Sequence, residues 1–327
     1  IEAAGRILAT VQGLSPEDLV LVLLSGGGSS LLALPAPGLT IEDLVETSRQ
    51  LLRSGAGIAE INCVRKHLSV LAGGRLAAAC HPARVMTLAI SDVPGNDPAV
   101  IASGPTVADP STFAEARAVL ARHGVTPPAA VLRHLEKAEE ETIKPGDPRL
   151  ARTEYVIVAT PETALSKATE AARAAGLPPV LLGTDWQQEA REAARLHARL
   201  VREIEQQRKG PLVLLSGGET SVTVRGQGRG GRNTEFLLAL ALALREVRAS
   251  RFVGALAADT DGLDGDQDNA GAILFPDSLD RATEAGLDPM RLLEDNDSHR
   301  FFAQLGDLFV TGPTRTNVND FRAVLVV

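Results

Sequence analysis

The sequence predicts an α/β protein of two domains. Strand-like apolar runs alternate with helical stretches rich in Ala and Leu along the chain, an order typical of α/β architecture with mostly parallel sheets. The chain has 327 residues, more than the roughly 250–300 at which single hydrophobic cores stop growing. With 44% hydrophobic and 23% charged residues, its composition is that of an ordinary globular protein.

Short apolar runs mark the predicted strands. Leu19–Leu24 is apolar without interruption, the pattern of a strand that is buried on both faces. Because ligands of open α/β sheets bind beyond the carboxyl ends of the strands, the segments after these runs are where a site is expected. The further predicted strands cover residues 85–90, 155–159, 179–182, 212–215, 252–257 and 308–310.

Helices follow from apolar residues at helical spacing. Thr40 and Asp43 form the pattern of a capping box ahead of Leu44, Leu51 and Leu52. The chain also opens on a helical pattern without a preceding cap, and it has no initial Met, which predicts that a segment has been removed upstream. Further helices are expected over residues 112–123, 128–141, 162–175, 191–208 and 233–247.

A domain boundary is predicted at residue 208. The long charged helix over residues 191–208 ends at Lys209, Gly210 and Pro211, and such a break is typical of a boundary. We therefore expect one domain over residues 1–208 and a smaller one over residues 209–327.

Charge and cysteine content exclude several classes of protein. The net charge is -8 and the pI about 5.4, so nucleic acid is not an expected partner. No apolar run approaches the ~18 residues of a membrane span, and a signal peptide is not expected from the sequence. Cys63 and Cys80 lack CxxC spacing, which favours buried free thiols in the reducing cytoplasm.

A glycine-rich segment follows the first predicted strand. It consists of Ser25, Gly26, Gly27, Gly28 and Ser29. Glycines allow backbone N–H groups to approach an anion closely. The segment lacks the Lys of a P-loop and is no GxGxxG fingerprint. An anion-binding loop and a plain tight turn are therefore both compatible with it.

A second strand end carries a carboxylate. Asp92 comes directly after the predicted strand over residues 85–90, within the sequence SDVPGNDP. This is a usual place for a metal ligand or a general base. A turn or helix cap is the alternative for Asp92.

The Ser-Gly-Gly pattern occurs again in the second half. Ser216, Gly217, Gly218 and Glu219 repeat the first glycine segment after another apolar run. We expect each domain to present one such glycine turn to a shared ligand, with chance similarity as the alternative.

An arginine- and glycine-rich stretch, RGQGRGGRN, ends at Arg232 and Asn233, where a helix is predicted to begin. Arginine suits bidentate binding of carboxylate or phosphate, and the start of a helix favours anions. We therefore expect Arg232, Asn233 and the loop amides to form the best anion site of the chain. The alternative is a solvated basic loop.

An acidic segment follows the run over residues 252–257. Five acids fall within ten residues, among them Asp261. The spacing does not fit an EF-hand, because neither the required Gly nor the final Glu is in place. An acidic loop beside an arginine-rich loop suits Mg²⁺ and phosphoryl transfer, whereas an exposed acidic turn is the simpler interpretation.

The histidines carry no comparable pattern. Arg65, Lys66 and His67 are consecutive and cannot all share one helix face. His67 is more typical of a hydrogen-bonding residue than of a catalytic base, and no metal-ligand spacing of His or Cys is present.

Six motifs in order give the chain a family resemblance. They read SGGGSSLL, NCVRKHLS with AGGRLA, ISDVPGNDPAVIASGPTVADP, LLSGGETSVTVRGQGRGGRNTEF, DTDGLDGDQDNAGAI and TGPTRTNVND. This order resembles the class II glycerate kinases, also known as the glycerate kinase/MOFRL family, some of whose members were named hydroxypyruvate reductases. The resemblance runs over essentially the whole chain.

The resemblance implies a Rossmann-like N-terminal domain, a smaller C-terminal MOFRL domain and an active site in the cleft between them. It implies ATP-dependent phosphorylation of D-glycerate to 2-phosphoglycerate with Mg²⁺. By the same resemblance, Asp92, Arg232 and Asp261 are catalytic, and the two Ser-Gly-Gly segments with Glu219 line the cleft. Asp92 and Asp261 are the expected metal ligands, one of them also accepting the substrate proton.

One departure from the family bears on activity. Family members begin earlier, with a Gly-Lys motif that has no counterpart in this sequence, so the N-terminal domain is expected to be incomplete. Two alternatives therefore remain: an NAD(P)H-dependent hydroxypyruvate reductase, and a non-catalytic remnant that binds an anion. The expected partner is a small hydroxy acid, and a homodimer is left open.

Overall fold

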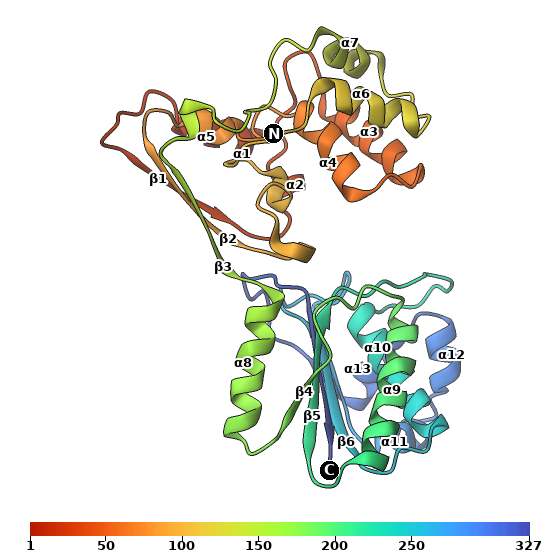
Figure 1. The fold of residues 1–327 in the computed structure, drawn as a ribbon. Coiled ribbons are helices and arrows are strands. Elements are labelled where there is room, and N and C mark those ends of the chain that lie inside the picture. Colours follow the sequence, from red (N-terminus) through yellow and green to blue (C-terminus); the bar gives the residue numbers. More distant parts are fainter. The chain divides into compact units, whose positions relative to one another are not determined.

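The computed structural model describes all residues from Ile1 to Val327, and the chain folds into two compact units. The N-terminal unit is Ile1–Val158 and the C-terminal unit is Ala159–Val327. Each unit has a sheet of its own and its own helices (Figure 1). The predicted α/β architecture with two domains is confirmed.

The boundary between the units differs from the predicted boundary at residue 208. Strand β4 (Pro179–Leu181) pairs in parallel with β5 (Leu212–Gly218). Helix α9 (Ala190–Gln207) shares the apolar core of the C-terminal unit through Ala193, Ala194 and Val201. Residues 159–208 therefore belong to the second unit, because their apolar side chains are buried there.

The N-terminal unit is built on three strands in the order β1-β2-β3. Strand β1 (Leu19–Leu24) pairs in parallel with β2 (Arg84–Ile90), and β3 (Thr153–Ala159) lies next to β2. The helices of this unit are α1 (Glu2–Thr10), α2 (Gly28–Leu31), α3 (Ile41–Arg53), α4 (Ile58–His67), α5 (Arg75–Ala79), η1 (Pro94–Asn96), η2 (Ile101–Ser103), α6 (Phe113–Arg122), α7 (Ala129–Lys137) and η3 (Pro148–Leu150).

Local capping sets where the helices of this unit begin. Thr40 and Asp43 form the predicted capping box at α3, with the Thr40 side chain accepting from the Asp43 N–H group. Thr112 and Glu115 cap α6 in the same way. Buried apolar side chains of α3, α4, α6 and α7 then pack into one cluster, so a helical layer forms beside the sheet.

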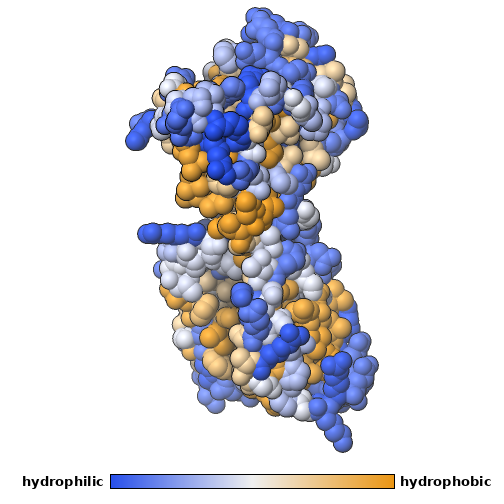
Figure 2. Space-filling model, turned by 60° about the vertical axis from the view of Figure 1, so that its left-hand side comes forward, coloured by the Kyte–Doolittle hydropathy of each residue, from blue (hydrophilic) through white to orange (hydrophobic).

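One face of the three-stranded sheet is exposed, which contradicts the prediction that β1 is buried on both faces. Leu19, Leu21 and Leu23 are 60%, 54% and 70% exposed. Val156 and Val158 of β3 are exposed as well, and Figure 2 shows apolar surface, in orange, on the N-terminal unit. An uninterrupted apolar run predicts a buried strand only where a second layer covers it, and α1 and α5 pack on the other face.

The C-terminal unit has a six-stranded mixed sheet in the order β4-β5-β9-β6-β7-β8. Its further strands are β6 (Phe252–Asp259), β7 (Gly271–Leu274), β8 (Leu308–Phe309) and β9 (Asp320–Val326). Only β4 and β5 are parallel, whereas the pairs from β5 to β8 are antiparallel. The expectation of mostly parallel sheets is wrong for this unit, because β9 returns from the end of the chain to lie between β5 and β6.

Helices cover both faces of this sheet (Figure 1). Helix α8 (Pro161–Ala174) packs on one face through Leu165 against Val213 and Leu215. On the other face α10 (Arg232–Glu246) is almost completely buried. Helices α11 (Ser278–Glu284), α12 (Pro289–Glu294) and α13 (Ser298–Leu305) complete that layer. None of the helices has both the length and the apolar character that crossing a bilayer requires.

Candidate functional site

The first glycine segment forms a tight turn at the end of β1. Gly27 adopts a left-handed conformation with φ of 80°, which favours glycine. A Cβ atom on Gly28 would lie 2.6 Å from Cβ of Ala102, so the turn approaches η2 too closely for a side chain. Ser29 Oγ and Ser103 Oγ are 3.0 Å apart and join the two segments by a hydrogen bond.

The glycine turn and Asp92 line one cavity of the N-terminal unit. Its volume is ≈ 790 Å³, and its wall includes all five residues from Ser25 to Ser29 together with Asp92. Burial raises the pKa of the Asp92 carboxyl above its ordinary value. The sequence-predicted residues of this unit therefore come together around one space that is large enough for a small molecule.

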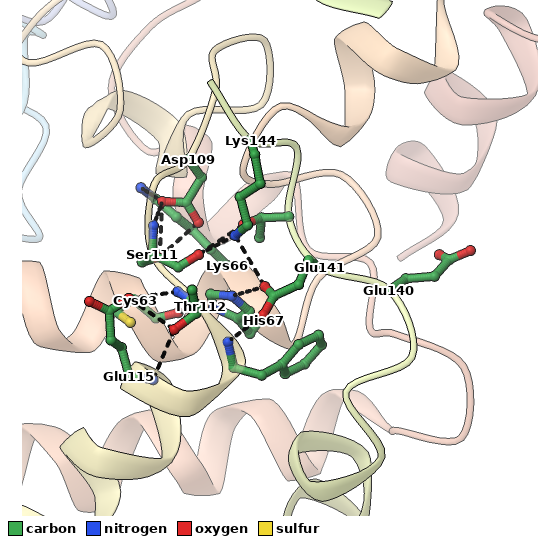
Figure 3. A network of polar contacts seen from close by, with 12 residues as sticks. Cys63, Lys66, His67, Asp109, Ser111, Thr112, Glu115, Glu140, Glu141 and Lys144 are labelled. Atoms are coloured by element: carbon green, nitrogen blue, oxygen red, sulfur yellow. Dashed lines mark hydrogen bonds and ion pairs between the residues drawn. The ribbon is translucent and has the colours of Figure 1, made fainter. Parts of the chain in front are cut away.

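Helix α4 contributes a wall of the same cavity through Ile58, Asn62 and Arg65. Spacings of four and three residues place these side chains on one helix face. Lys66 and His67 do not line the cavity and belong to a buried polar network (Figure 3). Lys66 Nζ donates to Asp109 Oδ1 over 3.3 Å, and both side chains are almost fully buried.

His67 is a structural residue of this network. Its Nδ1 donates to the Cys63 carbonyl over 2.8 Å, and its Nε2 lies 3.1 Å from Glu141 Oε2. Burial lowers the pKa of His67, while the contacts to Cys63 and Glu141 oppose that shift. The ring is completely buried, which agrees with a hydrogen-bonding role and leaves it no access to a substrate.

In the C-terminal unit, Arg232 is surrounded by three carboxylates. Its Nε donates to Asp320 Oδ1 over 2.8 Å, and its Nη1 donates to Glu219 Oε1 over 2.9 Å. Its Nη2 donates to Asp259 Oδ2. Burial alone would lower the pKa of Arg232, but the carboxylates of Asp320, Asp259 and Glu219 raise it. The guanidinium is thus permanently charged and held in one orientation.

Two residues of this cluster, Asp320 and Arg322, were not predicted as site residues. Asp320 opens β9 and also accepts from Asn233 Nδ2 over 2.8 Å. Arg322, with no exposed surface, donates to Asp320 Oδ2 over 2.6 Å and lies over the Phe236 ring. In the sequence, the one signal for Asp320 was its position as the last residue of the polar TGPTRTNVND motif.

The acidic segment turns sharply after β6. Asp259 Oδ1 accepts from the Asp261 N–H group over 3.1 Å, and Asp261 Oδ1 accepts from the Leu263 N–H group over 2.8 Å. Burial raises the pKa of Asp259, and the nearby Asp320 adds to this rise while Arg232 opposes it. Asp259 is therefore the acid in contact with Arg232, whereas the predicted Asp261 lies next to it on the partly exposed turn.

The start of α10 is occupied by a side chain of the protein. Both oxygens of Asp264 accept from the backbone N–H groups of Asn233 and Thr234 over 2.9 Å. Asn233 has no exposed surface. The helix dipole is therefore compensated by Asp264, and the N–H groups of Asn233 and Thr234 are not available to the predicted anion.

Backbone amides of the arginine- and glycine-rich loop also donate to acceptors within the protein. The N–H groups of Arg225 and Gly226 donate to Asn296 Oδ1, and that of Gln227 donates to Asp295 Oδ1. A Cβ atom on Gly226 would lie 2.2 Å from the Asp295 carbonyl oxygen. Close packing explains the glycines, and the expectation of an anion-binding loop is wrong for these amides.

The second Ser-Gly-Gly segment is part of a strand. Gly217 and Gly218 pair with β9 as the last residues of β5, so the predicted second glycine turn does not form. Ser216 Oγ is buried 2.9 Å from His197 Nε2. Gly218 has φ of 112° and lies too close to Trp186 for a Cβ atom. Glu219 is the exposed member of the segment and contacts Arg232.

Metal-binding capacity in this chain is limited to small donor sets. No group of three or more His, Cys, Asp or Glu side chains lies close enough together to hold a metal ion. Mg²⁺ is usually held by one or two carboxylates plus substrate phosphates, and Asp92 and Asp261 are carboxylates of that kind. They belong to different units, and their joint action at one metal ion stays a prediction.

Known proteins share this sequence and fold. A family described as "Domain of unknown function (DUF4147)" matches residues 1–136, and the MOFRL family matches residues 212–320. The D-glycerate 2-kinase of Thermotoga maritima is 40% identical over 330 residues, which cover 100% of this chain and 77% of that enzyme. The chain belongs to the glycerate 2-kinase family.

The glycerate 2-kinase fold extends over both units. The crystal structure of glycerate kinase from Thermotoga maritima matches with a TM-score of 0.89 and covers 100% of this chain and 77% of its own. A protein of Agrobacterium vitis that carries a hydroxypyruvate reductase name is 50% identical over 333 residues, which cover 100% of this chain and 74% of that protein. The resemblance recognised in the motifs is therefore confirmed, including its MOFRL domain.

Proposed function

We propose that this member of the glycerate 2-kinase family transfers the γ-phosphoryl group of ATP to the 2-hydroxyl group of D-glycerate. Relatives named glycerate 2-kinase match the chain over its whole length, and they support this reaction. Within the structure, the observation that carries the proposal is the cavity that Asp92 shares with the glycine turn. A carboxylate and backbone donors are the groups that such a transfer requires.

The chemistry is an in-line displacement. The hydroxyl oxygen of glycerate bonds to the γ-phosphorus, and the bond from that phosphorus to the β–γ bridging oxygen breaks. ADP leaves with the electron pair, and the hydroxyl proton passes to a carboxylate. Positioning and charge stabilisation dominate such transfers, so the protein needs few groups in direct contact with the reacting atoms.

Asp92 is our preferred proton acceptor. Burial raises its pKa, which makes the carboxylate more basic, while an ordinary carboxyl would bind the substrate proton only weakly. Asp261 is the alternative base. Its Oδ1 already accepts a backbone N–H group, so its other oxygen would have to act.

Arg232 would contact either the substrate carboxylate or the transferring phosphoryl group. Its three carboxylate partners hold the guanidinium in place, and exposed Glu219 is the partner that a ligand displaces most easily. When Mg²⁺ is bound, it would neutralise negative charge on the β- and γ-phosphates. Asp92 and Asp261 are the residues proposed to hold it.

Three finer expectations remain proposals. The cleft shared by both units rests on the family resemblance, and a homodimer stays an open expectation. A cytoplasmic location is supported by the two cysteines, which are both free thiols, as expected in a reducing compartment.

A coupled assay tests the proposed reaction. The chain is incubated with ATP, Mg²⁺ and D-glycerate, and enolase then converts 2-phosphoglycerate into a product that absorbs in the ultraviolet. We expect an enolase-dependent signal that requires D-glycerate. Product detected only after a phosphoglycerate mutase is added would place the phosphoryl group on the wrong hydroxyl. Oxidation of NADH with hydroxypyruvate would instead favour the reductase.

A further inference from the structure

Asn62 has an unusual environment on the cavity wall of the N-terminal unit. Its side chain is 5% exposed and lines the cavity, yet its amide has no hydrogen-bond partner in the protein. The amide is accessible from the cavity, so its hydrogen bonds can be made only by solvent or by a bound ligand. A polar group of this kind at a cavity wall can orient a ligand by hydrogen bonding.

The size and walls of the cavity suit a larger and less polar ligand than glycerate. Its volume of ≈ 790 Å³ lies in the range of roughly 300–1,000 Å³ that is typical of small-molecule sites. Glycerate has three carbons that all carry oxygen, so it gains little from an apolar wall. The aliphatic part of the wall is formed by Ile41, Leu44, Val45, Leu51, Leu52, Ile58, Val64 and Leu68.

The charge of the cavity favours an anion at one side. Arg53 and Arg65 line it together with Asp92, while Arg49 on the same wall is paired with Glu46 over 2.6 Å. The backbone N–H groups of Gly26 and Gly27 donate to no acceptor within the protein. Free amides and arginines are the groups that bind phosphate.

We infer that this cavity holds the adenine nucleoside of ATP, with the Asn62 amide bonded to the edge of the base and the glycine turn next to the phosphates. An Asn side chain offers one acceptor and two donors, which match the amino group and ring nitrogen of adenine in a bidentate pair. The aliphatic wall covers the faces of the ring. This inference rests on the proposed kinase function and assigns the nucleotide to the N-terminal unit.

The structure holds Asn62 in place before any ligand binds. In the last turn of α4, Lys66 and His67 are fixed by Asp109 and Glu141 (Figure 3). On the cavity side, Arg65 Nε donates to Ser48 Oγ of α3 over 3.2 Å. The rotation of α4 is therefore set by buried contacts, so the amide needs no rearrangement to meet the base.

Calorimetric titration of the whole chain with the Asn62→Leu variant tests the inference. The probes are a non-hydrolysable ATP analogue, its inosine counterpart, inorganic tripolyphosphate and D-glycerate. Loss of the bidentate pair, worth about 1–3 kcal/mol, corresponds to a loss of roughly 5- to 150-fold in affinity for the adenine analogue. We expect tripolyphosphate and D-glycerate to bind as they do to the wild type, and the preference for adenine over inosine to disappear.

A second variant keeps the test independent of folding. Val45 is half-exposed on α3 and lines the cavity, so Val45→Trp narrows the cavity without disturbing a buried contact. We expect it to weaken binding of the ATP analogue at least tenfold. Glu42→Trp, on an exposed position of α3 outside the cavity wall, is the matched control and should bind like the wild type. Circular dichroism verifies the fold of each variant.

The outcomes separate this inference from the proposed function. If the wild type phosphorylates D-glycerate while Asn62→Leu and Val45→Trp keep its affinity for the ATP analogue, the nucleotide binds elsewhere and the inference is overturned. Weaker D-glycerate binding with unchanged nucleotide binding would assign the cavity to the substrate and overturn it equally. Asn62-dependent nucleotide binding without any glycerate phosphorylation would support the inference and refute the kinase proposal.

Discussion

Arg232 Nε and Asp320 Oδ1 are joined by a hydrogen bond of 2.8 Å although 88 positions separate the two residues in the chain. Arg232 opens α10 and Asp320 opens β9. The pair therefore ties the start of a buried helix to a central strand. Substitutions at Arg232 consequently report on the fold as well as on the chemistry.

Arg232→Ala should lower both stability and turnover. Removing one partner of a buried ion pair typically costs about 3–5 kcal/mol, because the remaining charges of Asp259 and Asp320 are left uncompensated. Loss of a preorganised charge near the phosphoryl group should reduce kcat by about 10²–10³. Urea unfolding and the enolase-coupled assay measure the two effects separately.

Arg232→Lys is the matched variant for this experiment. Lysine keeps the positive charge but lacks the planar guanidinium that donates to three carboxylates. Stability should therefore fall less than in Arg232→Ala, while kcat stays low. A folded Arg232→Ala variant with wild-type turnover would remove Arg232 from the mechanism.

Asp92→Asn should abolish most of the activity. A general base typically contributes about 10²–10⁴ in rate, and the amide cannot accept the proton. Burial raises the pKa of Asp92, and the base acts only when ionised. The kcat/KM of the wild type should therefore fall as the pH drops through a value above the ordinary aspartate pKa.

Two further carboxylates serve as comparisons in that pH series. Asp97→Asn, at an exposed position in the same segment, should leave the profile unchanged. If Asp261→Asn rather than Asp92→Asn removes the acidic limb, Asp261 is the base and the preference for Asp92 is wrong.

Gly226→Ala should destabilise the C-terminal unit. The new Cβ atom would lie 2.2 Å from the Asp295 carbonyl oxygen, so the loop must shift and the hydrogen bonds of its amides with Asn296 and Asp295 weaken. Overpacking of this kind costs about 1–3 kcal/mol. The midpoint of urea unfolding measures the change.

Gly5→Ala is the control for Gly226→Ala. Gly5 lies inside α1, and a Cβ atom at this position would have no atom within 4 Å, so alanine should stabilise that helix by about 0.5–1 kcal/mol. Equal effects of the two substitutions would show that the loop glycines are not needed for packing.

His197 should make stability depend on pH. Burial lowers its pKa to about 4, and the neutral ring donates from Nδ1 to the Ala193 carbonyl and accepts at Nε2 from Ser216. An unfolded histidine has a pKa near ~6.5. Between these two values the unfolded chain binds a proton that the folded chain does not, so stability falls as the pH drops from ~6.5 towards 4.

A non-titrating variant isolates this contribution. His197→Gln should remove up to about 1.4 kcal/mol per pH unit from the slope of stability in that window. Parallel curves for the wild type and His197→Gln would contradict a neutral buried ring.

Local sequence patterns predicted much of this molecule. Thr40 and Asp43 predicted the start of α3, because a capping box acts within one turn of helix. The motif order predicted the family, and strand ends led to Asp92 and to the glycine turn that lines the same cavity. These features depend on residues that are close together in the chain.

Other features required the tertiary structure. The glycines near Arg232 were interpreted as an anion site, but their amides meet Asp295 and Asn296, about 70 residues later in the chain. Strand β9 was not predicted, so its residues Asp320 and Arg322 were missed as partners of the site. Asn62 stands in a helical pattern like any polar residue, and only packing shows that its amide lacks a partner.

The sequence by itself determined the family, the α/β class and the start of helices such as α3, because periodicity and capping are local properties of the chain. The tertiary structure decided which charged groups meet, because the order of strands in a sheet brings together residues such as Arg232 and Asp320 from distant positions. It also decided which apolar runs are covered, since burial of β1 depends on a second layer and not on the run itself.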